Sequence, residues 1–224
     1  MARQNRVTPE GEIIAHPGRG LFMGNRGILH DGGGRIVAPF RHRNWVCCVT
    51  AFRGRNRTVM APGRYTELFF LDEAVALAAG HRPCGECRRQ DYAAFRASWA
   101  AATGDGLPDA PEMDRALHAA RIAPRKRTQR TFEAEIGDLP DGTFIRAESG
   151  PAVILGGRLL PWSPEGYGTP RPRPATGRVT VLTPAPSVAV LRAGYRPVLH
   201  PSALAAAAAP AGTEVADRSA EDAG

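Results

Sequence analysis

The sequence predicts an α+β protein, with a small unit of β-hairpins and helices followed by a β-rich C-terminal lobe. Three observations support this class. Residues 44–71 contain short β-branched and aromatic runs between turn signals. From residue 72 the apolar positions change to helical spacing. Residues 128–202 return to short apolar runs separated by Gly and Pro, which is typical of a small barrel or a curled sheet.

Short strands and tight turns dominate the N-terminal part. Gly32, Gly33 and Gly34 form a turn signal but match no nucleotide-binding loop. Asn and Arg in 54–57 indicate a polar turn, and Pro62-Gly63 indicates another. We expect strands at residues 13–14, 27–29, 45–52, 58–60 and 66–71.

Helical signals follow. Asp72 is a good N-cap for a short helix over 73–79, which Gly80 would close. A second helix over 88–102 places Tyr92, Phe95 and Trp99 on one face, which favours a core position over base stacking. A third helix, capped by Asp109, covers 112–122.

The composition changes again after the third helix. We divide the chain into 1–103 as the hairpin and helix unit, 104–127 as a linker with a helix, 128–202 as the β-rich lobe and 203–224 as a disordered tail rich in alanine. Within the lobe we expect a short helix at 184–194 and strands at 143–145, 152–155, 158–160 and 178–182.

The chain is basic. Its 224 residues carry a formal net charge of +7, with Lys126 the only lysine. Arginine forms bidentate hydrogen bonds to phosphate, so two arginine clusters are candidate nucleic-acid contacts, although both clusters would also fit solvated faces. The candidate contacts are Arg41, Arg43, Arg53, Arg55 and Arg57 in the first cluster and Arg125, Lys126 and Arg127 in the second.

Four cysteines form the most specific feature of the sequence. Cys84 and Cys87 have the spacing of a zinc knuckle, in which one turn presents two thiolates to a tetrahedral ion. The other ligands would come from Cys47, Cys48, His30, His42 or His81, and strand alternation would let only one of the two adjacent cysteines reach the metal. Two alternatives stay open for Cys84 and Cys87: inert thiols, or redox thiols activated by a helix N-terminus.

The segment from Phe69 to Cys87 resembles the second half of the Ada-type metal-binding domain, which runs strand, short helix, Ala-Gly-Phe/Tyr-Arg-Pro-Cys-x-x-Cys. The resemblance covers residues 66–87. It implies zinc ligation by Cys84 and Cys87 and contact with DNA. The family's first pair, Cys-x-x-x-Cys, has no counterpart in 59–65. Because that pair includes the family's methyl acceptor, we do not predict phosphotriester repair.

Three functions are compatible with these residues. The first is a zinc-supported nucleic-acid-binding protein, with DNA favoured. The second is a metal-dependent nuclease or repair enzyme using His30 and Asp31, a pair that equally fits a plain turn. The third is a protein-interaction module with incidental charge. We find neither a signal peptide nor a transmembrane run, and so expect a cytoplasmic protein without disulfides or membrane contact. The oligomeric state is not predicted.

Overall fold

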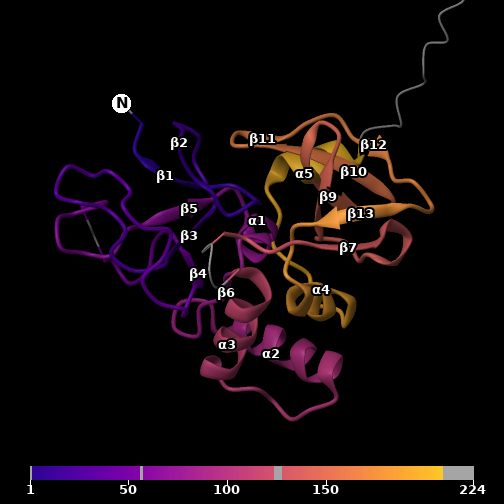
Figure 1. The fold of residues 1–224 in the computed structure, drawn as a ribbon, viewed down its shortest axis with the longest axis horizontal. Coiled ribbons are helices and arrows are strands. Elements are labelled where there is room, and N and C mark those ends of the chain that lie inside the picture. The colour runs from indigo at the N-terminus through magenta and orange to yellow at the C-terminus, as the bar shows by residue number, and fades with distance from the viewer. Residues whose placement is uncertain (1, 56–57, 124–127, 209–224) are drawn as a thin grey trace, which may run out of the picture.

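The computed structural model describes residues 2–55, 58–123 and 128–208. Within them the chain forms two β-sheets and five α-helices, which confirms the α+β class and the β-rich C-terminal lobe. Figure 1 shows the first sheet built from the N-terminal half, the second from the C-terminal half, and helix α1 between them.

The first sheet is mixed and has the strand order β2-β1-β5-β3-β4-β6. Strands β1 and β5 are parallel, as are β4 and β6, whereas β3 pairs antiparallel with both β4 and β5. Its strands are β1 (Gln4–Val7), β2 (Ile13–Ala15), β3 (Phe22–Asn25), β4 (Val46–Val49), β5 (Leu68–Phe70) and β6 (Arg82–Pro83).

The second sheet is antiparallel throughout, with the order β11-β10-β9-β8-β13-β7 and with β12 beside β10. A 3₁₀ turn, Ile136–Asp138, follows β7. The strands are β7 (Phe132–Glu135), β8 (Phe144–Ala147), β9 (Gly150–Leu155), β10 (Arg158–Ser163), β11 (Gly166–Tyr167), β12 (Arg171–Pro172) and β13 (Arg178–Val181).

The helices begin and end at the residues that cap them. Asp72 accepts a hydrogen bond from the N–H of Val75, and Gly80, with φ of 76°, closes the same helix. Asp109 forms a capping box with Glu112. The helices are α1 (Glu73–Ala78), α2 (Arg89–Thr103), α3 (Ala110–Arg121), α4 (Ala185–Arg192) and α5 (Pro201–Ala208).

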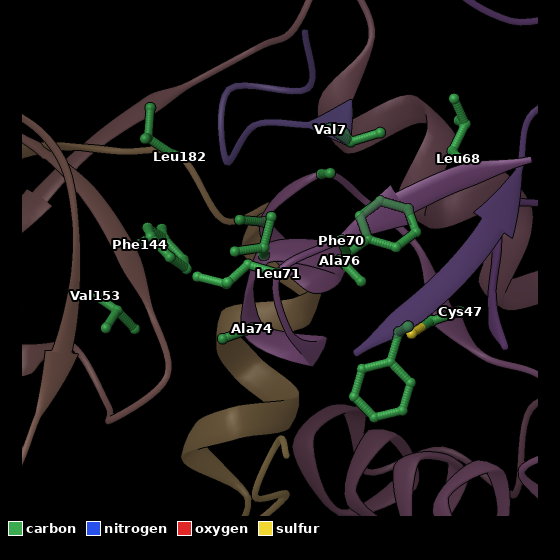
Figure 2. Packing of buried hydrophobic residues seen from close by; sticks show 14 of the residues in the cluster. Val7, Cys47, Leu68, Phe70, Leu71, Ala74, Ala76, Phe144, Val153 and Leu182 are labelled. Carbon is green, nitrogen blue, oxygen red and sulfur yellow. The ribbon is translucent and has the colours of Figure 1, made fainter. Parts of the chain in front are cut away.

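One hydrophobic core joins the two lobes. Every residue of α1 is buried, and its cluster extends from Phe70 and Leu71 to Phe144 and Val153 of the second sheet. Figure 2 shows Leu71 and Phe144 side by side between the two halves. Because α1 supplies apolar surface to both sheets, the two lobes share one hydrophobic core. The predicted boundaries at residues 103 and 128 divide the sequence but do not divide this core.

A second cluster packs α2, α3 and α4 together. Phe95 and Trp99 are buried in it and Tyr92 lies at its edge, so the aromatic stripe is core, as predicted. The remaining cluster lies within the second lobe and contains Ile136, Leu139, Ile145, Ile154, Val181 and Val188.

Several predicted elements are wrong in detail. Residues 27–29 are not a strand, since Gly27 has φ of 106° and the Leu29 N–H donates to the Thr66 hydroxyl. Residues 58–60 form a turn, with Met60 at a positive φ of 57°. Residues 203–208, expected to belong to the tail, lie in α5, and Ala203 is buried in the shared core. The rest of the expected tail, 209–224, lies outside the described residues.

Candidate metal centre

Three cysteines from two separate segments converge. Cys48 lies on β4, whereas Cys84 and Cys87 lie on the turn between β6 and α2. Their sulfur atoms all lie within 4.8 Å of one another, and each cysteine is partly exposed. Sulfur atoms that share a tetrahedral ion at about 2.3 Å lie roughly 3.8 Å apart, so this spacing is close enough to hold a metal ion.

Strand pairing brings the two segments together. Strands β4 and β6 run parallel, with Cys47 opposite Pro83, and the Cys84 N–H donates to the Cys47 carbonyl over 2.9 Å. The turn then closes through the Arg88 N–H, which donates to the Cys84 carbonyl over 3.1 Å. The Glu86 N–H points at the Cys84 sulfur over 3.4 Å. A backbone donor on the sulfur stabilises the thiolate form that a metal requires.

Cys47 belongs to the core and not to the centre. Successive side chains on a strand point to opposite faces, and Cys47 is fully buried in the main cluster while Cys48 joins Cys84 and Cys87. The sulfur of Cys47 accepts a hydrogen bond from Nη1 of Arg88 over 3.4 Å. Cys47 therefore lies outside the sulfur group, and only one of the two adjacent cysteines joins it.

The thiols perturb one another strongly. Hydrogen bonds from the Cys48 thiol and from the backbone of Cys87 and Glu86 lower the pKa of Cys84 to about 5. The hydrogen bond to Cys84 raises the Cys48 pKa, and burial and the charges of Cys84 and Cys87 raise it further. Burial and the charge of Cys84 also raise the Cys87 pKa. Three ionised thiolates at this separation need a cation between them.

The three sulfurs line a cavity of about 440 Å³, which Tyr65 and Glu67 also line. Glu67 is buried and its Oε2 accepts a hydrogen bond from the Met60 N–H over 2.7 Å. Among the described residues no further His, Cys, Asp or Glu joins the sulfur group. Three protein ligands leave one position of a tetrahedral ion for solvent or a bound molecule, as in catalytic rather than closed structural sites.

The catalytic candidates His30 and Asp31 hold loops together instead. His30 is buried, with Nδ1 2.6 Å from the Thr66 hydroxyl and Nε2 3.3 Å from the Ala61 carbonyl. Oδ1 of Asp31 accepts hydrogen bonds from the N–H groups of Gly33 and Arg35, each at 3.0 Å. Both side chains are engaged in local structure, so neither supports the catalytic interpretation.

The arginine candidates that the structure describes lie on the surface. Arg41, Arg43, Arg53 and Arg55 are all exposed. Arg53 and Arg55 stack on Phe52, with guanidinium carbons 5.0 and 5.3 Å from the ring centroid, and Arg55 also pairs with Glu86 at 2.8 Å. Phe52, Arg55 and Glu86 line the same cavity as the sulfurs. The other four candidates, Arg57, Arg125, Lys126 and Arg127, lie outside the described residues.

Sequence reasoning missed the burial of two arginines and a histidine at Trp45. Arg26 and Arg121 are 2% and 1% exposed, and His81 is fully buried against Trp45 and Phe70. No sequence signal separated these arginines from the exposed ones, because arginine is rarely buried and Arg121 begins a basic run.

No family model, curated protein or solved structure matches this chain. Within the described ranges, no helix is long and apolar enough to cross a bilayer.

Proposed function

We propose that the chain is a zinc-supported nucleic-acid-binding protein, with DNA the favoured partner. The observation that carries the proposal is the convergence of Cys48, Cys84 and Cys87. Thiolates are soft ligands that select zinc or other thiophilic metals over magnesium or calcium. The turn's N–H donors to sulfur also suit a zinc knuckle, and the likeness of residues 66–87 to the Ada-type domain agrees with this choice.

Exposed arginines beside the site support the nucleic-acid part of the proposal. Arg53 is exposed next to the cavity, and Arg55 lines it while paired to Glu86. Guanidinium groups above an aromatic ring present their N–H edges outward, where phosphate oxygens accept from them. In this arrangement zinc would hold β4 to the turn before α2. Arg53 and Arg55, in the loop that follows β4, would contact the phosphate backbone of the polynucleotide.

Elemental analysis combined with a binding assay tests the proposal. We expect about one zinc per chain in freshly reduced protein, and binding to duplex DNA that weakens steeply with salt. Chelation should release the zinc and weaken DNA binding together. A metal-free protein would overturn the zinc assignment. A metal-loaded protein that binds neither DNA nor RNA at low salt would leave the protein-interaction function.

A second candidate, a metal-dependent enzyme acting on nucleic acid, is favoured by the cavity beside the sulfurs. If Cys48, Cys84 and Cys87 hold a metal ion, the ion would supply an activated water as nucleophile near neutral pH. Glu67, which is buried and also lines the cavity, is a carboxylate candidate for proton transfer. Glu67→Gln keeps an acceptor for the Met60 N–H. Loss of turnover with unchanged DNA binding in this variant would favour the enzyme, whereas no turnover in the native protein would exclude it.

A further inference from the structure

Two arginines are buried side by side at an aromatic ring. Arg26 follows β3, and Arg121 is the last residue of α3. The guanidinium carbon of each lies 4.4 Å from the centroid of a Trp45 ring. The indole offers each cation a partial attraction through its π-face, but it supplies no hydrogen-bond acceptor and no negative charge.

These cations lack the partners that buried charges normally have. Within the described residues, Arg26 donates one hydrogen bond, from Nη1 to the Gly11 carbonyl at 2.9 Å, and its Nε and Nη2 have no partner there. Nε and Nη1 of Arg121 are likewise unpartnered. Neither arginine forms an ion pair with a carboxylate of the described chain. A buried charge without a counter-charge is strongly unfavourable, so the missing partner is expected to be an anion.

The neighbouring imidazole does not fill that role. His81 packs on Trp45 with ring centroids 5.2 Å apart, and neither of its nitrogens has a hydrogen-bond partner. Burial, followed by the charges of Arg26 and Arg121, lowers the His81 pKa well below its usual value. The ring is therefore neutral and gives the two guanidinium groups no negative charge.

A cavity of about 450 Å³ lies against this pair. Arg26, Arg121, Trp45 and Gln129 are among its lining residues. Its acidic lining residues are Glu10 and Glu12. Glu10 is paired to Arg146 at 2.7 Å. The cavity is therefore lined by three arginines, Arg26, Arg121 and Arg146, and by two carboxylates.

Gly11 keeps the entrance to the pair open. It has φ of +83°, and a Cβ there would lie 2.7 Å from Nη2 of Arg121 and 2.9 Å from Oε1 of Gln129. Any side chain at this position would therefore occupy the space in front of the Arg121 guanidinium. The positive φ and the close approach of the Arg121 and Gln129 side chains both favour glycine at this position.

We propose that Arg26 and Arg121 form a binding site for a phosphate-class oxyanion that enters through this cavity. Two guanidinium groups present several N–H donors in the planar geometry that phosphate oxygens accept. The cavity is larger than a phosphate group alone, so it also accommodates part of an organic group esterified to it. The phosphate belongs either to a small molecule or to a polynucleotide. The site shares no residue with the metal centre and does not depend on it.

Calorimetric titration of the full-length protein tests the site with three probes: inorganic phosphate, a nucleoside monophosphate and a short oligonucleotide lacking terminal phosphates. We expect one molecule of a phosphate-bearing probe per chain, and binding at least about tenfold weaker in Arg26→Gln and in Arg121→Gln. Arg35→Gln, at an exposed side chain outside the cavity, is the matched control and should bind as the native protein does. Binding of the small probes identifies a small-molecule site, and binding of the oligonucleotide alone identifies a backbone phosphate.

Gly11→Ala provides a second variant if the arginine variants do not fold. It leaves both charges in place and closes the approach to Arg121, so it should also weaken binding about tenfold or more. Metal content should be unchanged in Gly11→Ala, which separates this site from the metal centre. Absence of binding by the native protein to all three probes at millimolar concentration would overturn the proposal. So would Arg26→Gln, Arg121→Gln or Gly11→Ala proteins that fold and bind as the native chain does.

Discussion

Arg88 and Glu73 form a buried bidentate ion pair directly behind the metal centre. Nη1 and Nη2 of Arg88 donate to Oε1 and Oε2 of Glu73, each over 2.8 Å, and the side chains are 2% and 0% exposed. Glu73 also accepts hydrogen bonds from the Tyr195 hydroxyl at 2.6 Å and the Val198 N–H at 2.9 Å. Because Arg88 follows Cys87 in the chain, this pair connects the cysteine turn to α1 and to the C-terminal segment.

Removing one partner of this pair should be costly. Arg88→Met leaves the Glu73 carboxylate buried without a cation, and we expect a loss of about 3–5 kcal/mol in the free energy of unfolding. The double variant Arg88→Met with Glu73→Gln should recover a large part of that loss, since the uncompensated charge is gone. Urea denaturation of the two single variants and the double variant measures the coupling. Single-variant losses that simply add in the double variant would show that the pair is not coupled.

The shared core predicts that the two lobes unfold together. Phe144 is fully buried in the cluster that contains α1, so Phe144→Ala should cost about 3–5 kcal/mol and should lower the stability of both lobes. Far-ultraviolet circular dichroism and release of the bound metal should follow one transition. Leu107→Ala, at a side chain 62% exposed, is the control and should shift the transition little. Metal release that is unaffected by Phe144→Ala would contradict a common core.

Asp72 should make stability fall between pH 4 and pH 6. Burial raises the Asp72 pKa to about 6, despite hydrogen bonds from Val75, His200 and Tyr167. Because the folded state then binds a proton more tightly than the unfolded state, Asp72 contributes roughly 3 kcal/mol to the free energy of unfolding below its unfolded pKa of about 4. This contribution is lost as the pH rises through 6. Asp72→Asn has no carboxyl group and lacks this contribution.

Urea midpoints of the native protein and of Asp72→Asn at pH 4 and at pH 6.5 check this sign. We expect the native protein to lose more stability than the variant over this interval. Parallel pH profiles for the two proteins would show that Asp72 does not titrate there.

Phosphate contacts by the exposed arginines predict a change in salt dependence. Arg53→Gln and Arg43→Gln should each weaken DNA binding for all sequences, and each should reduce the slope of log affinity against log salt by about 0.9. Arg178→Gln, at an exposed arginine on β13 of the second sheet, is the control. Fluorescence titrations at several salt concentrations provide the slopes. Equal slopes for the native protein and all three variants would contradict a backbone contact at Arg43 or Arg53.

The sequence predicted the group of Cys48, Cys84 and Cys87 better than it predicted the residues around this group. The Cys84–Cys87 spacing predicted two members of the sulfur group, whereas the further ligands stayed open among Cys47, Cys48, His30, His42 and His81. Helices α1 and α3 were also predicted within two residues at each end, because Asp72, Gly80 and Asp109 are strong capping signals, whereas α5 was not predicted.

Long-range pairing explains what the sequence did not predict. Placing Cys48 beside Cys84 requires the parallel register of β4 and β6, and no local pattern encodes that register. The burial of Arg26 and Arg121 likewise depends on a tertiary contact, at Trp45, between segments far apart in the chain. In the sequence, His30 and Asp31 resembled a catalytic pair. Adjacency along the chain does not show that the His30 side chain contacts Thr66 while the Asp31 side chain bonds to its own turn.

Comparison of Cys48→Ser with Cys47→Ser tests the central claim most directly. The two positions are adjacent on one strand, and only Cys48 belongs to the sulfur group. We expect purified native protein and Cys47→Ser to contain about one zinc per chain by elemental analysis, and Cys48→Ser to lose most of its zinc affinity. Equal zinc content in the two variants, or none in the native protein, would contradict a metal centre at Cys48, Cys84 and Cys87.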